Sequence, residues 1–174
     1  MASITFPGLK AYGDALRQLE IALENEDLLK DVVWAGAQPV ADEIRRNIEM
    51  IRPGDLVKTS SGWLYRTGPT PEAKQAMLDG LGIAPPRVPN PGEADTKVGF
   101  DGFFGPRTAR HTRGYSIKME AYSWEHGTSY QAKLPFIRPA IKNTRKEAVD
   151  EMDKAIADGL KKYLKGDVYE QDFR

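Results

Sequence analysis

The stretch Trp124-Glu125-His126-Gly127-Thr128, followed by Pro135-Phe136-Ile137-Arg138-Pro139-Ala140, decides how the chain enters its last long segment. It reads as the end of a strand, a tight turn, a loop and a helix that begins near a proline. A strand that reverses direction often needs a positive φ angle, which glycine adopts without the steric cost of a side chain. Gly127 therefore predicts the turn, and the hydroxyl of Thr128 can bond back to the turn backbone.

The two prolines of this stretch frame the start of the helix. Pro135 favours an extended approach, and Pro139 suits a first helical turn, where no backbone N–H is needed. Phe136 and Ile137 are expected to pack into the core where the helix meets the sheet. Arg138 has two open interpretations: it contacts a carboxylate of a neighbouring subunit, or it lies in solvent.

Outward from this stretch, apolar spacing predicts helices at both ends of the chain. Steps of three and four residues mark helices over 9–23 and 33–48, and the second passes through Pro39 with a kink. A short helix over 72–81 is predicted from Pro71 near its start and Gly82 after it. The last helix starts near Pro139 or at Thr144, where Thr144 and Glu147 form a capping-box pattern. Its buried face is marked by Val149, Met152, Ile156, Leu160, Tyr163 and Leu164.

Short strands are predicted between these helices. Residues 56–58 and 63–66 read as a hairpin, 96–100 as a strand, and 115–121 as a half-buried strand with alternating apolar residues. Four prolines between 85 and 92 indicate an extended surface loop or linker. The prediction is an α+β fold with a mixed or antiparallel sheet of three to five strands, packed by N- and C-terminal helices. We expect one domain over 1–174, with a variable insertion around 69–95 and a flexible loop around 100–114.

The balance of charges and the absence of cysteine exclude several classes of protein. Lys and Arg number 25 and Asp and Glu also number 25, so no overall positive field attracts nucleic acid or an anionic membrane. The chain has no cysteine, which excludes disulfides, thiolate catalysis and cysteine-ligated zinc. No apolar run approaches the roughly 20 residues of a membrane span, and the first residues lack the pattern of a signal peptide. We therefore expect a protein made in the cytoplasm, without a membrane partner.

His126 beside Glu125 is the arrangement that most suggests catalysis, with the imidazole as a base oriented by the carboxylate. Adjacent residues on a strand point to opposite faces, so the two side chains are not expected to bond to each other. No nucleophile motif accompanies them, and no His or acidic cluster has metal-ligand spacing. We expect no catalytic residue, metal or cofactor. Glu125, His126 and Arg138 are instead assigned to a turn or a subunit interface.

The segment around 100–114 reads as a mobile hairpin tip with two phenylalanines and several cationic residues. Arginine and aromatic residues are enriched at the centres of protein interfaces. We therefore favour partner docking through Phe103, Phe104, Arg107, Arg110 and Arg113. Two alternatives stay open: a solvated loop, and contact of the basic stretch 107–113 with nucleic-acid phosphates.

The motifs Glu-His-Gly-Thr (125–128) and Pro-Phe-Ile-Arg-Pro-Ala (135–140), in this order and before a long helix, resemble the tail-component family of long-tailed bacteriophages. This family comprises the small neck and tail-completion proteins that join capsid to tail. The two front helices and the region from Tyr115 to Leu164 carry the resemblance. The stretch from Arg52 to Arg113 departs from the family pattern, because Thr67-Gly68 comes late and a proline-rich segment follows it.

The resemblance implies a structural virion protein without catalysis. Such proteins form a ring, usually sixfold, at the head–tail junction, as a tail-completion or connector component. Their neighbours are head-closure or connector proteins and tail-tube or tail-terminator proteins, and DNA passes through the ring without specific recognition. The alternative is a DNA-associated or regulatory binding module that uses the basic loop 107–113.

Overall fold

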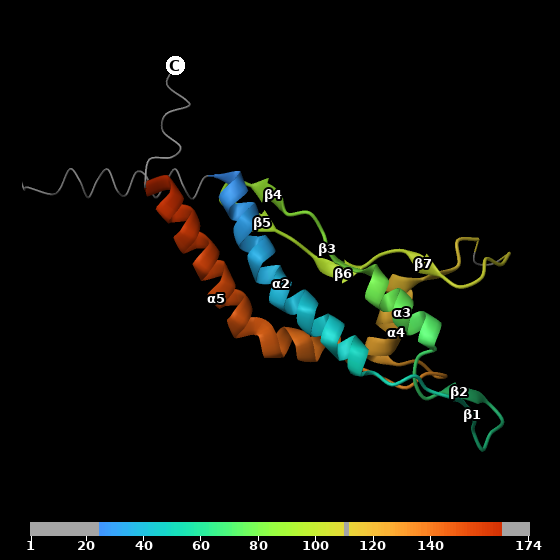
Figure 1. Ribbon diagram of the computed structural model, residues 1–174. Coiled ribbons are helices and arrows are strands. Elements are labelled where there is room, and N and C mark those ends of the chain that lie inside the picture. The colour runs from blue at the N-terminus through green and yellow to red at the C-terminus, as the bar shows by residue number, and fades with distance from the viewer. Residues whose placement is uncertain (1–24, 110–111, 165–174) are drawn as a thin grey trace, which may run out of the picture.

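The computed structural model describes residues 25–109 and 112–164. Two long helices, α2 (Glu26–Met50) and α5 (Ile137–Leu164), lie side by side, and the shorter helices and the strands gather beside them (Figure 1). The predicted α+β class with flanking helices is confirmed. The helix predicted over 9–23 lies outside the described residues.

Helix α2 is a single helix that continues through Pro39, as predicted, and it begins earlier than the apolar pattern indicated. The Asn25 carboxamide oxygen caps its start by accepting the backbone N–H groups of Asp27 and Leu28 at 2.9 and 3.0 Å. At its other end, the Lys74 ammonium group donates to the carbonyl of Ile51 at 2.8 Å. Both ends of the helix therefore have side-chain partners for backbone groups that a helix leaves unpaired.

Helix α5 runs antiparallel to α2, since Asn143 bonds to Glu43 at one end and Leu28 packs against Leu160 near the other. It begins at Ile137, close to Pro139. The capping box predicted at Thr144 was wrong, because this residue is buried inside the helix and its hydroxyl donates to the carbonyl of Ala140 at 2.8 Å. The N-terminal part of α2 and the C-terminal part of α5 pack together through a small apolar cluster of Leu28, Val32, Met152, Ala155, Ile156 and Leu160.

The main core lies where α2 and α5 meet two shorter helices, α3 (Pro71–Gly80) and α4 (Ile117–His126). Helix α3 was predicted to within one residue at each end, and its start is capped by the Thr70 hydroxyl, which accepts the N–H of Ala73 at 3.1 Å. The core contains Ile44, Ile48, Ala73, Met77, Leu81, Ile117, Ala121, Trp124, Phe136 and Ala140. Part of the segment 69–95 therefore belongs to the core.

The strand predicted over 115–121 was wrong, because this segment is mostly helix α4. The alternation of apolar and polar residues there coincides with a second pattern of helical period. Ile117, Ala121 and Trp124 are buried on one face, whereas Met119 is 69% exposed. Tertiary packing selects the 3.6-residue period, since only a helix places these three residues together in the core.

The strands are short and antiparallel, and they pair in four separate two-stranded ladders instead of one sheet. The predicted hairpin is confirmed, and it projects from the end of the molecule that holds α3 and α4 (Figure 1). The predicted strand at 96–100 is also present, over a shorter range. The ladders are β1 (Leu56–Lys58) with β2 (Leu64–Arg66), β3 (Leu81–Ile83) with β6 (Val98–Phe100), β4 (Arg87–Asn90) with β5 (Glu93–Asp95), and β7 (Phe103–Phe104) with β8 (Tyr115–Ser116).

The proline-rich stretch 85–92 was predicted to contain no regular element, and this was wrong: it holds β4 and the turn to β5. The turn is Pro91-Gly92, where Gly92 has a φ of +79° that favours glycine. Arg87 forms a bidentate ion pair with Asp95 across the ladder, at 3.1 and 3.0 Å. The pairing is irregular between Arg87 and Asn90, in keeping with a proline inside β4.

Candidate functional site

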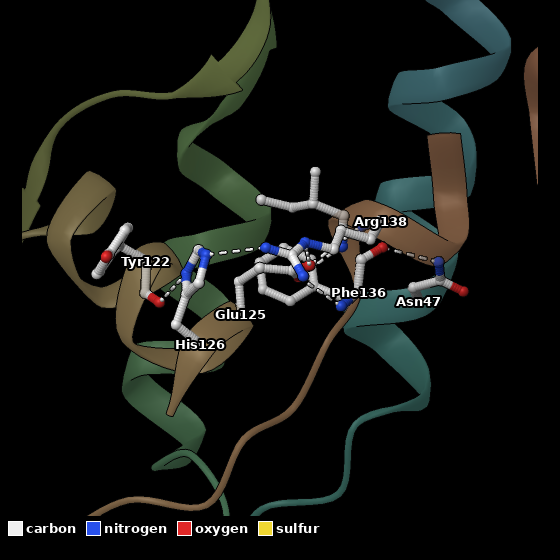
Figure 2. A network of polar contacts seen from close by, with 7 residues as sticks. Asn47, Tyr122, Glu125, His126, Phe136 and Arg138 are labelled. Carbon is white, nitrogen blue, oxygen red and sulfur yellow. Dashed lines mark hydrogen bonds and ion pairs between the residues drawn. The ribbon is translucent and has the colours of Figure 1, made fainter. Parts of the chain in front are cut away.

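The two sequence motifs meet where α4 ends and α5 begins, in an arrangement that we call the joint (Glu125, Gly127 and residues 134–138). The carboxylate of Glu125 accepts three backbone N–H groups from the start of α5. The distances are 2.8 Å to Phe136, 2.9 Å to Ile137 and 3.2 Å to Arg138. Figure 2 shows the carboxylate beneath the first turn of the helix. Glu125 lies outside α5 but caps its N-terminus. In most helices this role belongs to the side chain of the N-cap residue, directly before the first helical residue.

The environment of Glu125 keeps its carboxylate ionised. The side chain is only 4% exposed, and burial alone would raise its pKa. The three backbone N–H groups and the Arg138 guanidinium outweigh burial, so the pKa of Glu125 lies below its ordinary value. A buried negative charge at the N-terminus of a helix is also favoured by the helix dipole. The ionised carboxylate thus stabilises the start of α5.

Further contacts fix the joint against α2 and the core. The Asn47 carboxamide in α2 donates to the carbonyl of Phe136 at 3.0 Å, and the N–H of Leu134 donates to the carbonyl of Trp124 at 2.7 Å. The Phe136 ring is 1% exposed and meets the Trp124 ring edge-on, with 6.1 Å between centroids. The expectation that Phe136 packs into the core at the start of the helix is confirmed.

Gly127 ends α4 with a φ of +76° and a ψ of 166°, a conformation that is essentially restricted to glycine. The positive φ angle predicted for this residue is confirmed, although it terminates a helix and not a strand. Thr128 and Gln131 exchange backbone hydrogen bonds in the following turn, and the Thr128 hydroxyl accepts the N–H of Tyr130 at 3.4 Å. Pro135 is exposed in the extended approach, and Pro139 lies in the first turn of α5.

His126 lies on the surface of the joint, between Tyr122 and Arg138 (Figure 2). Its ring stacks on that of Tyr122, with 4.3 Å between centroids, and its Nδ1 lies 3.1 Å from the Tyr122 carbonyl oxygen. A carbonyl oxygen only accepts, so Nδ1 carries the proton and Nε2 is left to accept from the Arg138 guanidinium at 3.5 Å. His126 and Glu125 do not bond to each other, as expected, but both contact the Arg138 guanidinium.

The structure corrects the role predicted for Glu125 and refines that of Arg138. Glu125 was placed among the interface residues, but it is buried and bonded to its own chain, so it is not available to a partner. Arg138 is 69% exposed, and its Nε lies 3.8 Å from Oε1 of Glu125. Glu125 of the same chain therefore supplies a carboxylate beside Arg138. His126 and Arg138 remain on the surface.

The structure gives the two phenylalanines of the 100–114 loop different environments. Phe104 is half-buried against the core and lies 5.9 Å from the Tyr115 ring, centroid to centroid. Phe103 is 48% exposed, and the Arg113 guanidinium lies 5.9 Å from its ring centroid. Arg107 is exposed, and Arg110 lies outside the described residues. Of the residues predicted for docking here, Phe103, Arg107 and Arg113 are on the surface.

Two surfaces of the molecule expose aromatic side chains. One is a groove of about 520 Å³ lined by Phe103, Arg113, Tyr115 and Met119, and Tyr122 is also exposed on α4. The other is the β1–β2 hairpin, where Trp63 is 76% exposed and lines a groove of about 440 Å³ with Leu64 and Tyr130. The sequence indicated no functional role for Met119, Tyr122, Trp63, Leu64 or Tyr130. The signal for Trp63 was an aromatic residue directly after the Ser-Ser-Gly turn of a predicted hairpin.

No family model, curated protein or solved structure matches this chain. Its role therefore has to be argued from its own residues. Across residues 25–109 and 112–164, no group of His, Asp and Glu is arranged to hold a metal ion. Over the same residues, no helix has the length and apolar character to cross a membrane. The candidate site is thus a buried joint that bears both sequence motifs, with two exposed aromatic surfaces nearby.

Proposed function

We propose that this chain is a structural, non-catalytic virion protein of the bacteriophage neck or tail. In this proposal it forms a sixfold ring at the head–tail junction as a tail-completion or connector component. Its neighbours are head-closure or connector proteins on one side and tail-tube or tail-terminator proteins on the other. DNA passes through the ring without specific recognition. The proposal starts from the resemblance of the motifs at 125–128 and 135–140 to the tail-component family.

The proposal rests mainly on one observation: the Glu125 carboxylate caps the start of α5. A carboxylate beside a histidine is the feature of this chain that most suggests acid–base chemistry. Three backbone N–H groups and Arg138 occupy this carboxylate, and its pKa is lowered. A general acid or base at neutral pH needs a carboxyl pKa that is raised toward 7. The Glu-His-Gly-Thr motif therefore fits an architectural role better than a catalytic one.

The distribution of exposed aromatic residues also favours an assembling protein. One surface exposes Trp63 and Tyr130, and the other exposes Phe103 and Met119. Each of these side chains is about half exposed or more, and each lines one of the two grooves. Large apolar side chains gathered on a surface commonly mark sites of protein contact. Two such surfaces on different elements suit a subunit that touches more than one neighbour.

Electron microscopy of the purified protein, alone and with tail tubes, tests this proposal. We expect rings in one of these samples, and we expect the chain to co-migrate with tails during sedimentation. A protein that is free of rings in both samples and absent from purified particles would overturn the ring proposal.

The same preparation distinguishes the DNA-binding alternative. Phosphate contacts weaken steeply as salt rises, because bound counterions are released. Strong, salt-sensitive DNA binding that is lost when Arg107 and Arg113 are replaced by glutamine would favour the binding module. Assembly that survives this double substitution but is lost on Phe103→Ser would favour docking through the aromatic groove.

A further inference from the structure

Helix α5 carries its charges in two blocks of opposite sign. The ten residues from Ile137 to Lys146 include four basic residues and no acidic one: Arg138, Lys142, Arg145 and Lys146. The next twelve residues include five acidic residues and one basic residue: Glu147, Asp150, Glu151, Asp153, Asp158 and Lys154. The sign of the charge changes between two adjacent residues near the middle of the helix.

This arrangement is unfavourable for a helix that faces only water. Like charges at i,i+3 and i,i+4 destabilise an isolated helix, whereas mixed charges at that spacing stabilise it. Lys142 has Arg138 and Lys146 at i±4, and Glu147 has Asp150 and Glu151 at i+3 and i+4. Repulsion within the two blocks is only partly offset within α5, by Lys154, which pairs with Glu151 and interacts with Asp150 and Glu147.

Apart from Lys154, the described chain places no ion pair on the exposed charges near the middle of α5. Arg145, Lys146, Asp150 and Asp153 are exposed, and none of them makes a hydrogen bond or ion pair within residues 25–109 and 112–164. Between them lies Val149, which was predicted to be buried but is 50% exposed. We call this surface of α5 the two-block face (Lys142, Arg145, Lys146, Val149, Asp150 and Asp153). Helix α5 forms an outer edge of the molecule, with α2 along its other side (Figure 1).

We propose that the two-block face binds a second copy of this chain, with the two α5 helices antiparallel and related by a twofold axis at Val149. Antiparallel pairing places the basic block of each helix against the acidic block of the other. Residues four positions either side of the axis lie opposite each other, so Arg145 faces Asp153 of the partner subunit. Lys146 then lies at a level between Asp150 and Asp153 of the partner subunit. The twofold axis repeats each contact, and the Val149 side chains meet at the centre.

Charge complementarity selects this occupant. A parallel pair would put basic block on basic block, so the face rejects a copy in that orientation. A nucleic acid would suit the basic half but would be repelled by Asp150 and Asp153. The apolar contribution is small, because Val149 is the one large apolar residue at the centre, so the attraction is mainly electrostatic. We therefore expect moderate affinity and a steep dependence on salt.

The contact is distinct from a ring interface and does not depend on the proposed function. A twofold contact uses the same patch on both copies and closes on itself, whereas a ring requires two different patches in contact. A dimer has twice the 19.4 kDa mass of the chain, and a ring is several times heavier. Mass measurements therefore distinguish failure of the dimer from failure of the ring.

Charge reversal with complementation tests the pairing by analytical ultracentrifugation of the full chain. One variant carries Arg145→Glu and Lys146→Glu, and the other carries Asp150→Lys and Asp153→Lys. Each variant alone places like charges in contact, and we expect its dimer dissociation constant to rise at least about tenfold. A mixture of the two restores opposite charges at both contacts, so dimers should return. Circular dichroism checks that both variants fold, which their exposed positions favour.

Salt and crosslinking provide independent measurements. Wild-type dimers should form at about 0.1 M salt and dissociate at about 1 M. Over this range the Debye length falls from about 10 Å to about 3 Å, so the attraction between the charges is screened. The chain has no cysteine, so Val149→Cys introduces a single thiol at the proposed axis, and oxidation should link two copies. Ala157→Cys is the matched control. Ala157 is also exposed on α5, but in the proposed dimer its two copies would lie about 24 Å apart along the helix axes.

Three outcomes overturn the inference. The first is a wild-type chain that stays monomeric at low salt. The second is a mixture of the charge-reversed variants that forms no more dimer than either alone. The third is crosslinking at Ala157→Cys as efficient as at Val149→Cys, because this would indicate random collision or a different register.

Discussion

The two parts of α5 differ in how their charges are satisfied. At its N-terminus, the single charge of Glu125 is buried and bonded to three N–H groups of the same chain. Along its middle, Arg145, Lys146, Asp150 and Asp153 are exposed and have no ion pair in the described chain. The residues that give the chain its recognisable motifs therefore hold the fold together. The four exposed charges along the middle of α5 lie outside both motifs.

Replacing Glu125 with alanine is expected to have the largest effect on the joint. The substitution leaves three N–H groups and the buried end of α5 without an acceptor, which we expect to cost about 3 kcal/mol of unfolding free energy. Urea denaturation followed by circular dichroism measures the loss. Glu147→Ala, which replaces an exposed glutamate on α5, is the control and should change stability by less than about 0.5 kcal/mol. Equal losses for the two variants would contradict the capping role of Glu125.

Gly127→Val tests whether backbone geometry or imidazole chemistry explains the Glu-His-Gly-Thr motif. Valine is strained at a φ of +76° and a ψ of 166°, and its Cβ would lie 3.1 Å from that of Lys133. We expect a loss of about 2 kcal/mol in unfolding free energy. His126→Ala should lose less, because the ring is exposed and makes one stacking contact. The idea fails if both proteins melt at the same temperature as wild type.

Acid should weaken the joint through Glu125. Its folded pKa is below the ordinary value of 4.5, so the stability it contributes is complete above pH 4.5 and is lost as the pH falls through the folded pKa. Unfolding free energy measured from pH 6 to pH 2 should therefore fall more steeply for wild type than for Glu125→Gln, whose side chain does not titrate. Parallel curves for the two proteins would show that Glu125 does not contribute.

The sequence predicted some elements of the fold correctly and others incorrectly, for physical reasons. Elements whose pattern and end signals agree were predicted, as for α3, where Pro71 and Gly82 bracket an apolar stripe. The segment 115–121 was misjudged because its apolar residues fit two periods at once. Only the core partners Phe136 and Ile48 decide between them. The proline-rich hairpin was missed because its pairing depends on a turn and an ion pair, Arg87 with Asp95, that local propensity does not reveal.

The site was predicted in part for a similar physical reason. Gly127 could be identified because a positive φ angle leaves a direct signature in residue type. The role of Glu125 could not, because its partners are backbone N–H groups eleven to thirteen residues later, and any sequence supplies such groups. Phe103 and Phe104 are adjacent in the sequence and equally apolar, so their different burial follows only from the packing around β7 and β8.

The smallest expected effect on stability comes from the exposed side of this comparison. Phe103→Ser removes a half-exposed ring, and we expect a change of less than about 0.5 kcal/mol in unfolding free energy. Phe104→Ser is its matched neighbour and should cost clearly more, because that ring packs against the core. Thermal melts of the two variants provide the comparison. If Phe103→Ser were the more damaging, the assignment of Phe103 to an outward-facing surface would be wrong.

The way α5 is held at one end has a mechanical consequence. A helix of 28 residues is about 42 Å long, so a tilt of about 5° at Glu125 moves its far end by about 4 Å. The direction of α5 at the joint, together with its packing against α2, thus determines where residue 164 lies. The hydrogen bonds to one carboxylate thus set the direction in which α5 leaves the joint, and the apolar cluster with α2 holds its C-terminal part in that direction.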